Sequence, residues 1–229
     1  MIAASVETRL DSDDIELQRK RMLSDTKPIS STGNGVAFDP DDLTVRDACI
    51  VSKPARAAEL LRSLVNSFKP SHSIELGTNI GVSSAYIARG CQPNRLTTFE
   101  VSSNRLVVAK DLHSRLGIRN VSYVEGFFEH TLAPFLSQTG PIDFAFIDGN
   151  HQFIATLDYF NLIQAHAAPV CLYVFDDIRW SDGMRQAWQK LSCDDRFSVV
   201  VDFDKVGVAV AEASANRAGR VSVGPIRIF

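Results

Sequence analysis

Short apolar runs alternate with amphipathic stretches from about residue 54 onward, and this alternation limits the possible folds most strongly. The strand-like runs are residues 73–76, 96–101, 121–124, 142–147 and 170–175. The stretches of helical period lie at about 82–89, 103–116, 128–137, 152–167 and 182–192. Strands joined through helices need crossover connections, which favour a mainly parallel sheet covered on both faces. The sequence therefore predicts an α/β fold with a Rossmann-like, doubly wound sheet.

The pattern changes after residue 196. Residues 197–203 and 206–211 are rich in β-branched and aromatic residues, and Asp204 and Lys205 alone separate them. So short a connection between two strands favours an antiparallel hairpin. We expect this hairpin at the edge of the sheet, an order unlike that of dinucleotide dehydrogenases.

A chain of 229 residues suits one α/β domain with an added segment. We divide it into an N-terminal arm (1–50), a domain (51–211) and a C-terminal tail (212–229). The arm is polar, contains the turn-rich stretch 30–35, and is expected to form a short helix over residues 12–24. Two interpretations stay open for it: a leader without fixed structure, or a lid or dimerisation arm. An amphipathic helix over residues 54–68 precedes the first strand.

Charge and cysteine content exclude several classes of protein. A net charge of −3 provides no basic field for nonspecific binding of nucleic acid. The chain has no signal-peptide pattern and no apolar run long enough to cross a bilayer. The cysteines form no CxxC pair, so we expect reduced thiols in a soluble, cytoplasmic protein without membrane contact. They are Cys49, Cys91, Cys171 and Cys193.

The most informative segment is Ser73-Ile74-Glu75-Leu76-Gly77-Thr78-Asn79-Ile80-Gly81-Val82-Ser83, a strand followed by a glycine-bearing turn and a helix. Glycines at 77 and 81 let the backbone pass close to a ligand. A helix that begins near Gly81 presents free amides to a ligand carboxylate. The spacing E-x-G-x-x-x-G differs from G-x-G-x-x-G and argues against NAD or FAD.

An acid, Glu100, ends the next strand. A carboxylate at the carboxyl end of the adjacent strand can bind both ribose hydroxyls of a nucleoside. The alternative is a charge at the start of the following helix, because Ser102 and its neighbours are good helix caps. The glycine loop one β-α unit earlier favours the ribose interpretation.

Two further strands end in acids, Asp148 after residues 142–147 and the pair Asp176–Asp177 after residues 170–175. The carboxyl ends of parallel strands lie along one edge of a sheet. Three carboxylates there suit a hard divalent cation, Mg²⁺ before Ca²⁺ or Mn²⁺. The alternatives are that one member of the pair caps the next helix, or hydrogen-bonds to a ligand residue without binding the metal itself.

His151 lies three residues beyond Asp148. At the start of a helix, positions three apart share a side, so His151 is predicted to face the same cleft. A neutral imidazole there is a suitable general base near neutral pH; the alternative is a cap or surface histidine. The other histidines carry no motif and are interpreted as structural: His72, His113, His130 and His166.

The segment from Ile74 to Ser83 resembles motif I of class I S-adenosylmethionine-dependent methyltransferases, and five parallel strands followed by a hairpin are their strand order. The resemblance covers about residues 50–211. It is strongest to the catechol and caffeoyl-CoA O-methyltransferases and their bacterial relatives that act on macrolide sugars. It implies cofactor contacts along the methionine part, the ribose and the adenine. The residues are Glu75, Gly77, Thr78, Asn79, Gly81, Ser83, Glu100, Gly126, Phe127 and Asp148.

The same resemblance implies a metal on Asp148, Asp176 and Asp177, with His151 and Asp148 as catalytic residues. The sugar-methylating branch has a histidine three positions after the aspartate, as here. The catechol branch has a lysine nearby, which residues 149–158 lack, and this puts catechol-like acceptors in doubt. We therefore expect transfer to a hydroxyl of a sugar or natural product, and an oligomer formed through the arm. The alternatives are a tRNA or small-amine methyltransferase, a nicotinamide-dependent oxidoreductase, and a noncatalytic cofactor-binding protein.

Overall fold

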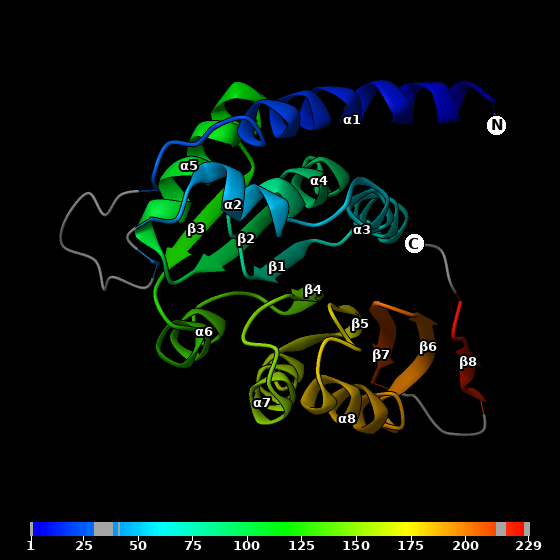
Figure 1. Cartoon of the computed structure of the whole chain (residues 1–229). Helices are drawn as coiled ribbons and strands as arrows, with labels where there is room; N and C mark the ends of the chain where they lie inside the picture. The colour runs from blue at the N-terminus through cyan, green and yellow to red at the C-terminus, as the bar shows by residue number, and fades with distance from the viewer. Residues whose placement is uncertain (1, 30–38, 41, 214–218, 227–229) are drawn as a thin grey trace. The chain divides into compact units, whose positions relative to one another are not determined.

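The computed structural model describes residues 2–29, 39–40, 42–213 and 219–226 (Figure 1). It divides into two compact units. The first comprises Met1–Lys69 and Thr78–Phe128, and the second comprises Pro70–Gly77 and Glu129–Phe229. Both are built from strands that alternate with helices.

Among its described residues, the first unit contains two parallel strands and five helices (Figure 1). Strands β2 and β3 pair in register from Leu96 opposite Val121 to Glu100 opposite Glu125. Helix α4 contacts α1, α3, α5 and β2, and its small and apolar side chains are almost all buried. The elements are α1 (Ile2–Met22), α2 (Val45–Ile50), α3 (Ala55–Phe68), α4 (Val82–Cys91), β2 (Arg95–Glu100), α5 (Ser103–Arg115) and β3 (Val121–Glu125).

Polar contacts fasten α1 to α4. The hydroxyl of Tyr86 donates to Glu16 Oε1 at 2.9 Å, and the guanidinium of Arg89 donates two bonds of 2.6 Å to the carboxylate of Asp14. A bidentate pair of this kind fixes direction as well as distance.

The helix expected over residues 12–24 is present as α1, and it begins ten residues earlier, at Ile2.

Helix α2 was not predicted, although its capping box is visible in the sequence. Thr44 Oγ1 accepts from the amide of Asp47, and Asp47 Oδ2 accepts from the amide of Thr44, each at 3.1 Å. This reciprocal pattern satisfies two amides at the start of a helix. A six-residue helix is too short to show the period of an amphipathic helix, which is why it escaped the pattern search. The turn-rich stretch 30–35 lies outside the described residues.

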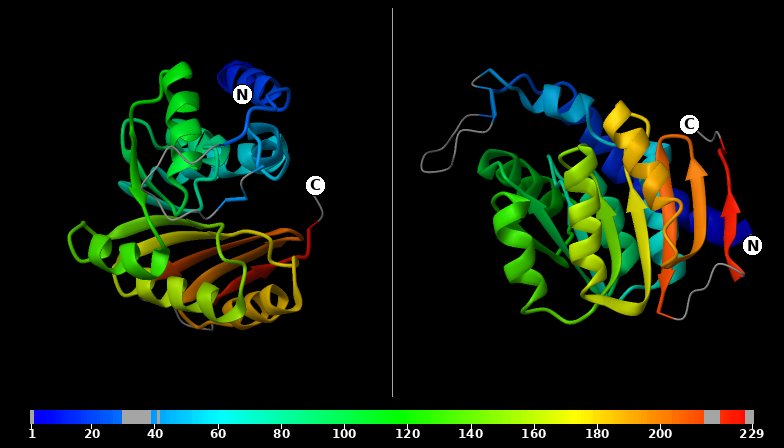
Figure 2. Two further views of the ribbon diagram at one scale, coloured as in Figure 1. Left: turned by 60° about the vertical axis from the view of Figure 1, so that its left-hand side comes forward. Right: turned by 90° about the horizontal axis from the view of Figure 1, so that it is seen from below.

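The described part of the second unit contains six strands in the order β1-β4-β5-β7-β6-β8. Strands β1, β4 and β5 are parallel, whereas β7 runs antiparallel to both β5 and β6. Figure 2 shows the last four strands of this order side by side, in yellow to red. The strands are β1 (His72–Leu76), β4 (Ile142–Ile147), β5 (Ala167–Phe175), β6 (Phe197–Phe203), β7 (Val206–Glu212) and β8 (Val221–Val223). The helices that follow β3, β4 and β5 are α6 (Phe128–Leu136), α7 (Phe153–Gln164) and α8 (Asp182–Leu191).

The antiparallel hairpin is present as predicted, but it is not the edge of the sheet. Strand β8, inside the expected tail, pairs with β6 in parallel, with Val199 opposite Val221. Three exposed residues in the sequence Val-Ser-Val carry no burial pattern, so the sequence contains no signal for this strand. Parallel strands joined by helices and closed by an antiparallel hairpin confirm the predicted α/β class. Within the described residues, no helix is long and apolar enough to cross a bilayer.

An aromatic cluster forms the core of the second unit beside the hairpin. The ring centroids of Phe160 and Tyr173 lie 5.1 Å apart, as do those of Phe160 and Phe197, and Phe175 contacts Trp188 at 6.0 Å. Such tilted and edge-on pairs add to the free energy gained by burial. The cluster fixes α7 and α8 against β5 and β6.

Gly207 lies directly under the Trp188 ring. A Cβ at this position would be 2.4 Å from Trp188 Cζ3, so Gly207→Ala is expected to displace the indole and lower the free energy of unfolding by about 1–3 kcal/mol. Urea unfolding followed by circular dichroism measures the change. Gly183→Ala is the matched control, since its Cβ would meet no atom closer than 3.5 Å and alanine favours helix α8. Equal stability of the two variants would contradict this packing.

Candidate active site

Gly77 lies where the chain leaves β1 and passes close to the end of β4. Its φ is +106°, and a Cβ there would lie 2.2 Å from the carbonyl oxygen of Asp148. The amide of Asp148 donates to the carbonyl of Leu76 at 2.9 Å, which fixes the approach. Any side chain at position 77 would therefore be strained and would clash with backbone. Glu75, two residues earlier on β1, is fully buried.

Gly81 precedes α4 and has a φ of +88°. A Cβ there would lie 2.9 Å from both Ala109 Cβ and His113 Nε2, on helix α5. Gly81 is the N-cap residue, and no side chain among the described residues caps this end of α4. The first amides of the helix therefore remain available to a ligand carboxylate. Ser83, in the first turn, is buried.

His113 holds the carbonyl group of Gly81. Its Nε2 lies 2.8 Å from Gly81 O, and its Nδ1 lies 2.6 Å from the hydroxyl of Tyr123. Because a carbonyl can only accept, Nε2 carries the proton and Nδ1 accepts from Tyr123. Burial lowers the pKa of His113 to about 4, so the ring is neutral at pH 7. His113 is structural, as predicted, but its contact with the motif glycine had no signal in the sequence because 32 residues separate the two.

The neutral state of His113 predicts a loss of stability in acid. The unfolded chain binds a proton at the ordinary pKa of 6.5 and the folded chain only near 4, so stability falls as the pH falls between these values. The loss approaches about 3 kcal/mol below pH 4. His113→Gln retains a donor and an acceptor without titrating, so it should flatten this part of the curve in urea unfolding. His130→Gln, at an exposed position, is the control; an unchanged slope in His113→Gln would refute the assignment.

Glu100 ends β2 and is 7% exposed. Its Oε2 accepts from the amide of Asn79 at 2.8 Å, and its Oε1 accepts from the amide of Ser102 at 3.1 Å. Burial raises the pKa of Glu100, while the two amides favour the ionised form. Ser102, not Glu100, caps α5, because Ser102 Oγ accepts from the amide of Arg105. The carboxylate therefore holds the loop that follows Gly77.

Thr78 and Asn79 lie in that loop. The hydroxyls of Thr78 and Thr98 are 2.6 Å apart in a buried contact that joins the loop to β2. Asn79 has a φ of +47°, and its side chain donates to the carbonyl of Ala48 at 3.0 Å and accepts from Arg105 Nη1 at 3.3 Å.

Asp39 and Arg105 are residues that sequence reasoning missed. Arg105 Nε donates to Asp39 Oδ1 at 2.7 Å, and the hydroxyl of Ser102 donates to Asp39 Oδ2. The side chain of Asp39 is 3% exposed. Sixty-six residues separate Asp39 from Arg105, so no spacing rule could have paired them.

Gly126 and Phe127 directly follow strand β3, which ends at Glu125. Gly126 has a φ of +132°, and its amide donates to the carbonyl of Glu100 at 2.9 Å. Phe127 is 39% exposed, whereas Phe128 is partly buried. An exposed aromatic ring beside the end of β2 offers a flat apolar face to a ligand.

In the second unit, His151 faces two carboxylates. Its Nε2 lies 3.7 Å from Asp148 Oδ1 and 4.0 Å from Asp177 Oδ2. His151 precedes α7, which begins at Phe153, rather than lying on the helix as expected. The turn that brings His151 back beside Asp148 is formed instead at Asn150, whose φ is +59°. All three side chains of this cluster are between 19% and 34% exposed.

The two adjacent acids after β5 have different surroundings. Asp176 is 1% exposed and its amide donates to the carbonyl of Ile147, whereas Asp177 has a φ of +48° and its carboxylate faces His151. Both acids follow β5, which ends at Phe175, and the chain turns at Asp177. Of the three predicted metal ligands, Asp148 and Asp177 face His151, and Asp176 is buried. Within the described ranges, no three His, Cys, Asp or Glu side chains are placed to hold a metal ion.

Three residues after the acidic pair have clear environments. Arg179 donates two hydrogen bonds to the carboxylate of Asp202, at 2.8 and 2.9 Å, and this ion pair stabilises the fold. Met184 is buried and accepts from Thr156 Oγ1. Trp180 is 74% exposed, and its amide donates to the carbonyl of Asp177.

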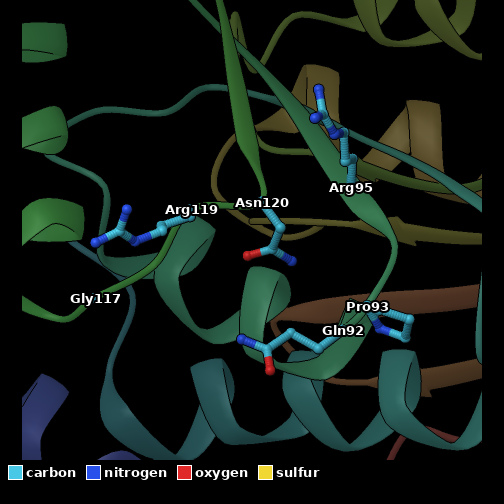
Figure 3. Close-up of a pocket in the computed structure, with 6 residues that line it drawn as sticks. All are labelled: Gln92, Pro93, Arg95, Gly117, Arg119 and Asn120. Atoms are coloured by element: carbon cyan, nitrogen blue, oxygen red, sulfur yellow. The ribbon is translucent and has the colours of Figure 1, made fainter.

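The first unit also contains a cavity of about 630 Å³. It lies where β2 and β3 begin, at the end of these strands away from Glu100 and Gly126. Figure 3 shows the side chains of Arg95 and Arg119 directed to opposite sides of Asn120. No residue of the predicted site lines this cavity. Its lining is Gln92, Pro93, Arg95, Gly117, Arg119 and Asn120.

Comparisons with known proteins agree with the motif. Residues 74–178 match a family model described as a methyltransferase domain. No curated protein matches the chain significantly. Among solved structures, the O-methyltransferase from Bacillus cereus in complex with SAH is 20% identical, with 70% of this chain and 82% of that chain covered and a TM-score of 0.61.

Two further solved structures are similar to this chain. Cofactor-bound Rv0187 from MTB is 21% identical, with 92% of this chain and 97% of that chain covered and a TM-score of 0.66. TomG from Streptomyces achromogenes, an O-methyltransferase of tomaymycin synthesis in complex with SAM, is 23% identical, with 71% and 81% covered and a TM-score of 0.60. The predicted Rossmann-like fold is confirmed, and the match of residues 74–178 to a methyltransferase domain agrees with the resemblance found in the sequence.

Proposed function

We propose that this chain is an S-adenosylmethionine-dependent methyltransferase that transfers a methyl group to a hydroxyl of a small molecule, of the sugar or natural-product type. One observation carries the proposal. The loop Thr78–Gly81 is held by the buried carboxylate of Glu100, through the 2.8 Å bond from the Asn79 amide, inside the segment that matches a methyltransferase domain. The O-methyltransferases similar in fold support a hydroxyl acceptor.

Each part of the cofactor has a corresponding group in the chain. The open amides at the start of α4 suit its carboxylate. Glu100 retains acceptor capacity for ribose hydroxyls, since each of its oxygens accepts one amide. Phe127 offers an exposed ring to adenine. Gly77 and Gly81 let the loop backbone pass close to the end of β4 and to helix α5, where a Cβ would clash, and so set the course of the loop.

His151 is the proposed general base. When bound, S-adenosylmethionine supplies a methyl group on a positively charged sulfur. His151 would accept the proton of the acceptor hydroxyl as the acceptor oxygen takes up that methyl group. Asp148 and Asp177, 3.7 and 4.0 Å from His151 Nε2, stabilise the imidazolium that results.

A divalent ion has no step in this mechanism. Asp176 is buried, Asp148 and Asp177 face His151, and no three such side chains among the described residues are placed to hold an ion, so these residues do not fit a three-carboxylate Mg²⁺ site. Hydroxyl activation is therefore assigned to His151.

A cytoplasmic location is supported by four free cysteines, three of them buried.

Glu100→Ala is expected to weaken cofactor binding at least tenfold, because it removes the ribose acceptor and releases the Asn79 amide. Calorimetric titration with S-adenosylmethionine measures the dissociation constant. Glu125→Ala is the matched control, since Glu125 is exposed and lies opposite Glu100 at the end of β3. Absence of binding to the unmodified protein at millimolar cofactor would refute the proposal.

His151→Gln is expected to lower kcat by about 10²–10⁴-fold while leaving cofactor affinity unchanged. The assay follows formation of S-adenosylhomocysteine with a panel of hydroxylated acceptors, with and without EDTA. Asp177→Asn should lower kcat less, because Asp148 remains beside the imidazole. A His151→Gln enzyme with full activity, or activity abolished by EDTA in the unmodified enzyme, would contradict the assignment of His151.

A further inference from the structure

We infer that Asp39 and Arg105 are positioning residues for the cofactor loop, and that docking of the segment Thr44–Ile50 is coupled to cofactor binding. The inference rests on the proposed function, since it concerns the loop assigned to the cofactor. It makes two parts of the N-terminal arm, Asp39 and the segment Thr44–Ile50, regulators of that loop.

Asn79 is the point at which the two parts meet. Its backbone amide donates to Glu100 Oε2, and the two ends of its side-chain amide contact different elements. Nδ2 donates to Ala48 O, in α2, and Oδ1 accepts from Arg105 Nη1, in α5. A left-handed φ of +47° is uncommon for a residue with a side chain and is retained where surrounding contacts hold it. All three contacts of Asn79 therefore select one loop conformation.

Asp39 sets the position of Arg105. Its carboxylate accepts from Arg105 Nε at 2.7 Å and from the hydroxyl of Ser102, and its side chain is nearly buried. A charge-assisted pair that is shielded from water is stronger than an exposed one. The amide of Ser102 also donates to Glu100. Asp39 therefore contacts both Ser102 and Arg105, the two residues of α5 and its cap that lie next to contacts of the cofactor loop. An arginine without this partner would be free to leave Asn79.

A separate set of hydrogen bonds holds the segment Thr44–Ile50 on its other side. The amide of Val45 donates to Lys27 O at 3.1 Å, and the amide of Arg46 donates to Asp25 O at 2.8 Å. Arg19, at the end of α1, donates to Lys53 O at 2.6 Å. Backbone bonds therefore attach the segment to residues 25–27, which follow α1, and the bond from Asn79 to Ala48 attaches it to the cofactor loop. That bond transmits a change in the loop to α2.

Thermodynamic coupling follows from this arrangement. If the docked segment favours the loop conformation that binds the cofactor, the cofactor favours the docked segment by the same factor. Loss of Asp39 should weaken cofactor binding without removing any group that the cofactor contacts. Bound cofactor should in turn slow hydrogen exchange of the amides of residues 45–50.

The test uses calorimetric titration with S-adenosylhomocysteine on the full chain. Asp39→Asn and Arg105→Gln are each expected to raise the dissociation constant about tenfold, and the double variant no further, because the two residues act as one unit. Asp111→Asn and Arg115→Gln are matched controls on the same helix. Their ion pair has the same 2.7 Å distance but is about 60% exposed and does not touch the loop. The controls should bind as the unmodified protein does.

Hydrogen exchange of residues 45–50 distinguishes positioning from general loss of stability. Bound S-adenosylhomocysteine should slow exchange in the unmodified protein and in Arg115→Gln, but not in Asp39→Asn. If Asp39→Asn loses its cooperative unfolding transition, Asn79→Gly replaces it. Glycine accepts the left-handed φ and removes the amide that contacts Ala48 and Arg105, without leaving a buried charge unpaired.

Asn79→Gly should then show both the weaker binding and the lost protection. Unmodified protein that does not bind S-adenosylhomocysteine would overturn the proposed function itself. Unmodified protein that binds, with Asp39→Asn and Arg105→Gln equal to it in affinity and in exchange, would overturn this inference alone.

Discussion

Two backbone amides, one from Asn79 and one from Ser102, converge on the carboxylate of Glu100, and the candidate cofactor site depends on this contact. A carboxylate that is almost completely buried is costly unless donors surround it. The position of Glu100 at the end of β2 therefore requires the loop on one side and the start of α5 on the other to turn their amides toward it. The loop and the helix are ordered by the same charge.

Close backbone approach is the second constraint. Gly81 leaves room for Ala109 and for the His113 ring that binds its carbonyl, and Gly77 leaves room for the carbonyl of Asp148. Different neighbours thus require the two glycines. Gly81 is required by α5, in the first unit, and Gly77 by the end of β4, in the second. A motif that reads as a single pattern in the sequence is held by two separate sets of contacts.

Left-handed residues mark the ends of the strands that carry the site. Among the described residues other than glycine, positive φ occurs at Asn79, Asn150 and Asp177, besides Lys69 and Asp204 in connections. The first three follow β1, β4 and β5. Each turns the chain sharply where it leaves the sheet, and each brings a functional group toward a partner: an amide to Glu100, or a side chain of the His151 cluster to its neighbours. Strain of this kind is typical of functional sites.

The period of apolar residues was enough to predict the parallel strands, the hairpin and most helices, because burial of one face imposes that period on the sequence. Strand β8 and helix α2 were missed because three and six residues are too few to show it. The glycine loop and Glu100 were readable for a related reason, since both are local consequences of a strand that ends in a turn.

The sequence by itself determined which residues stand at the ends of the strands: Gly77, Glu100, Asp148, His151, Asp176 and Asp177. The tertiary structure alone decided what each of them faces. Asp176 and Asp177 are neighbours in the chain, yet one is buried and the other is directed at His151, because the chain turns at Asp177, whose φ is +48°. Asp39 reaches Arg105 across 66 residues, and His113 reaches Gly81 across 32. Contacts over such separations depend on how helices pack, and packing leaves no local pattern in the sequence.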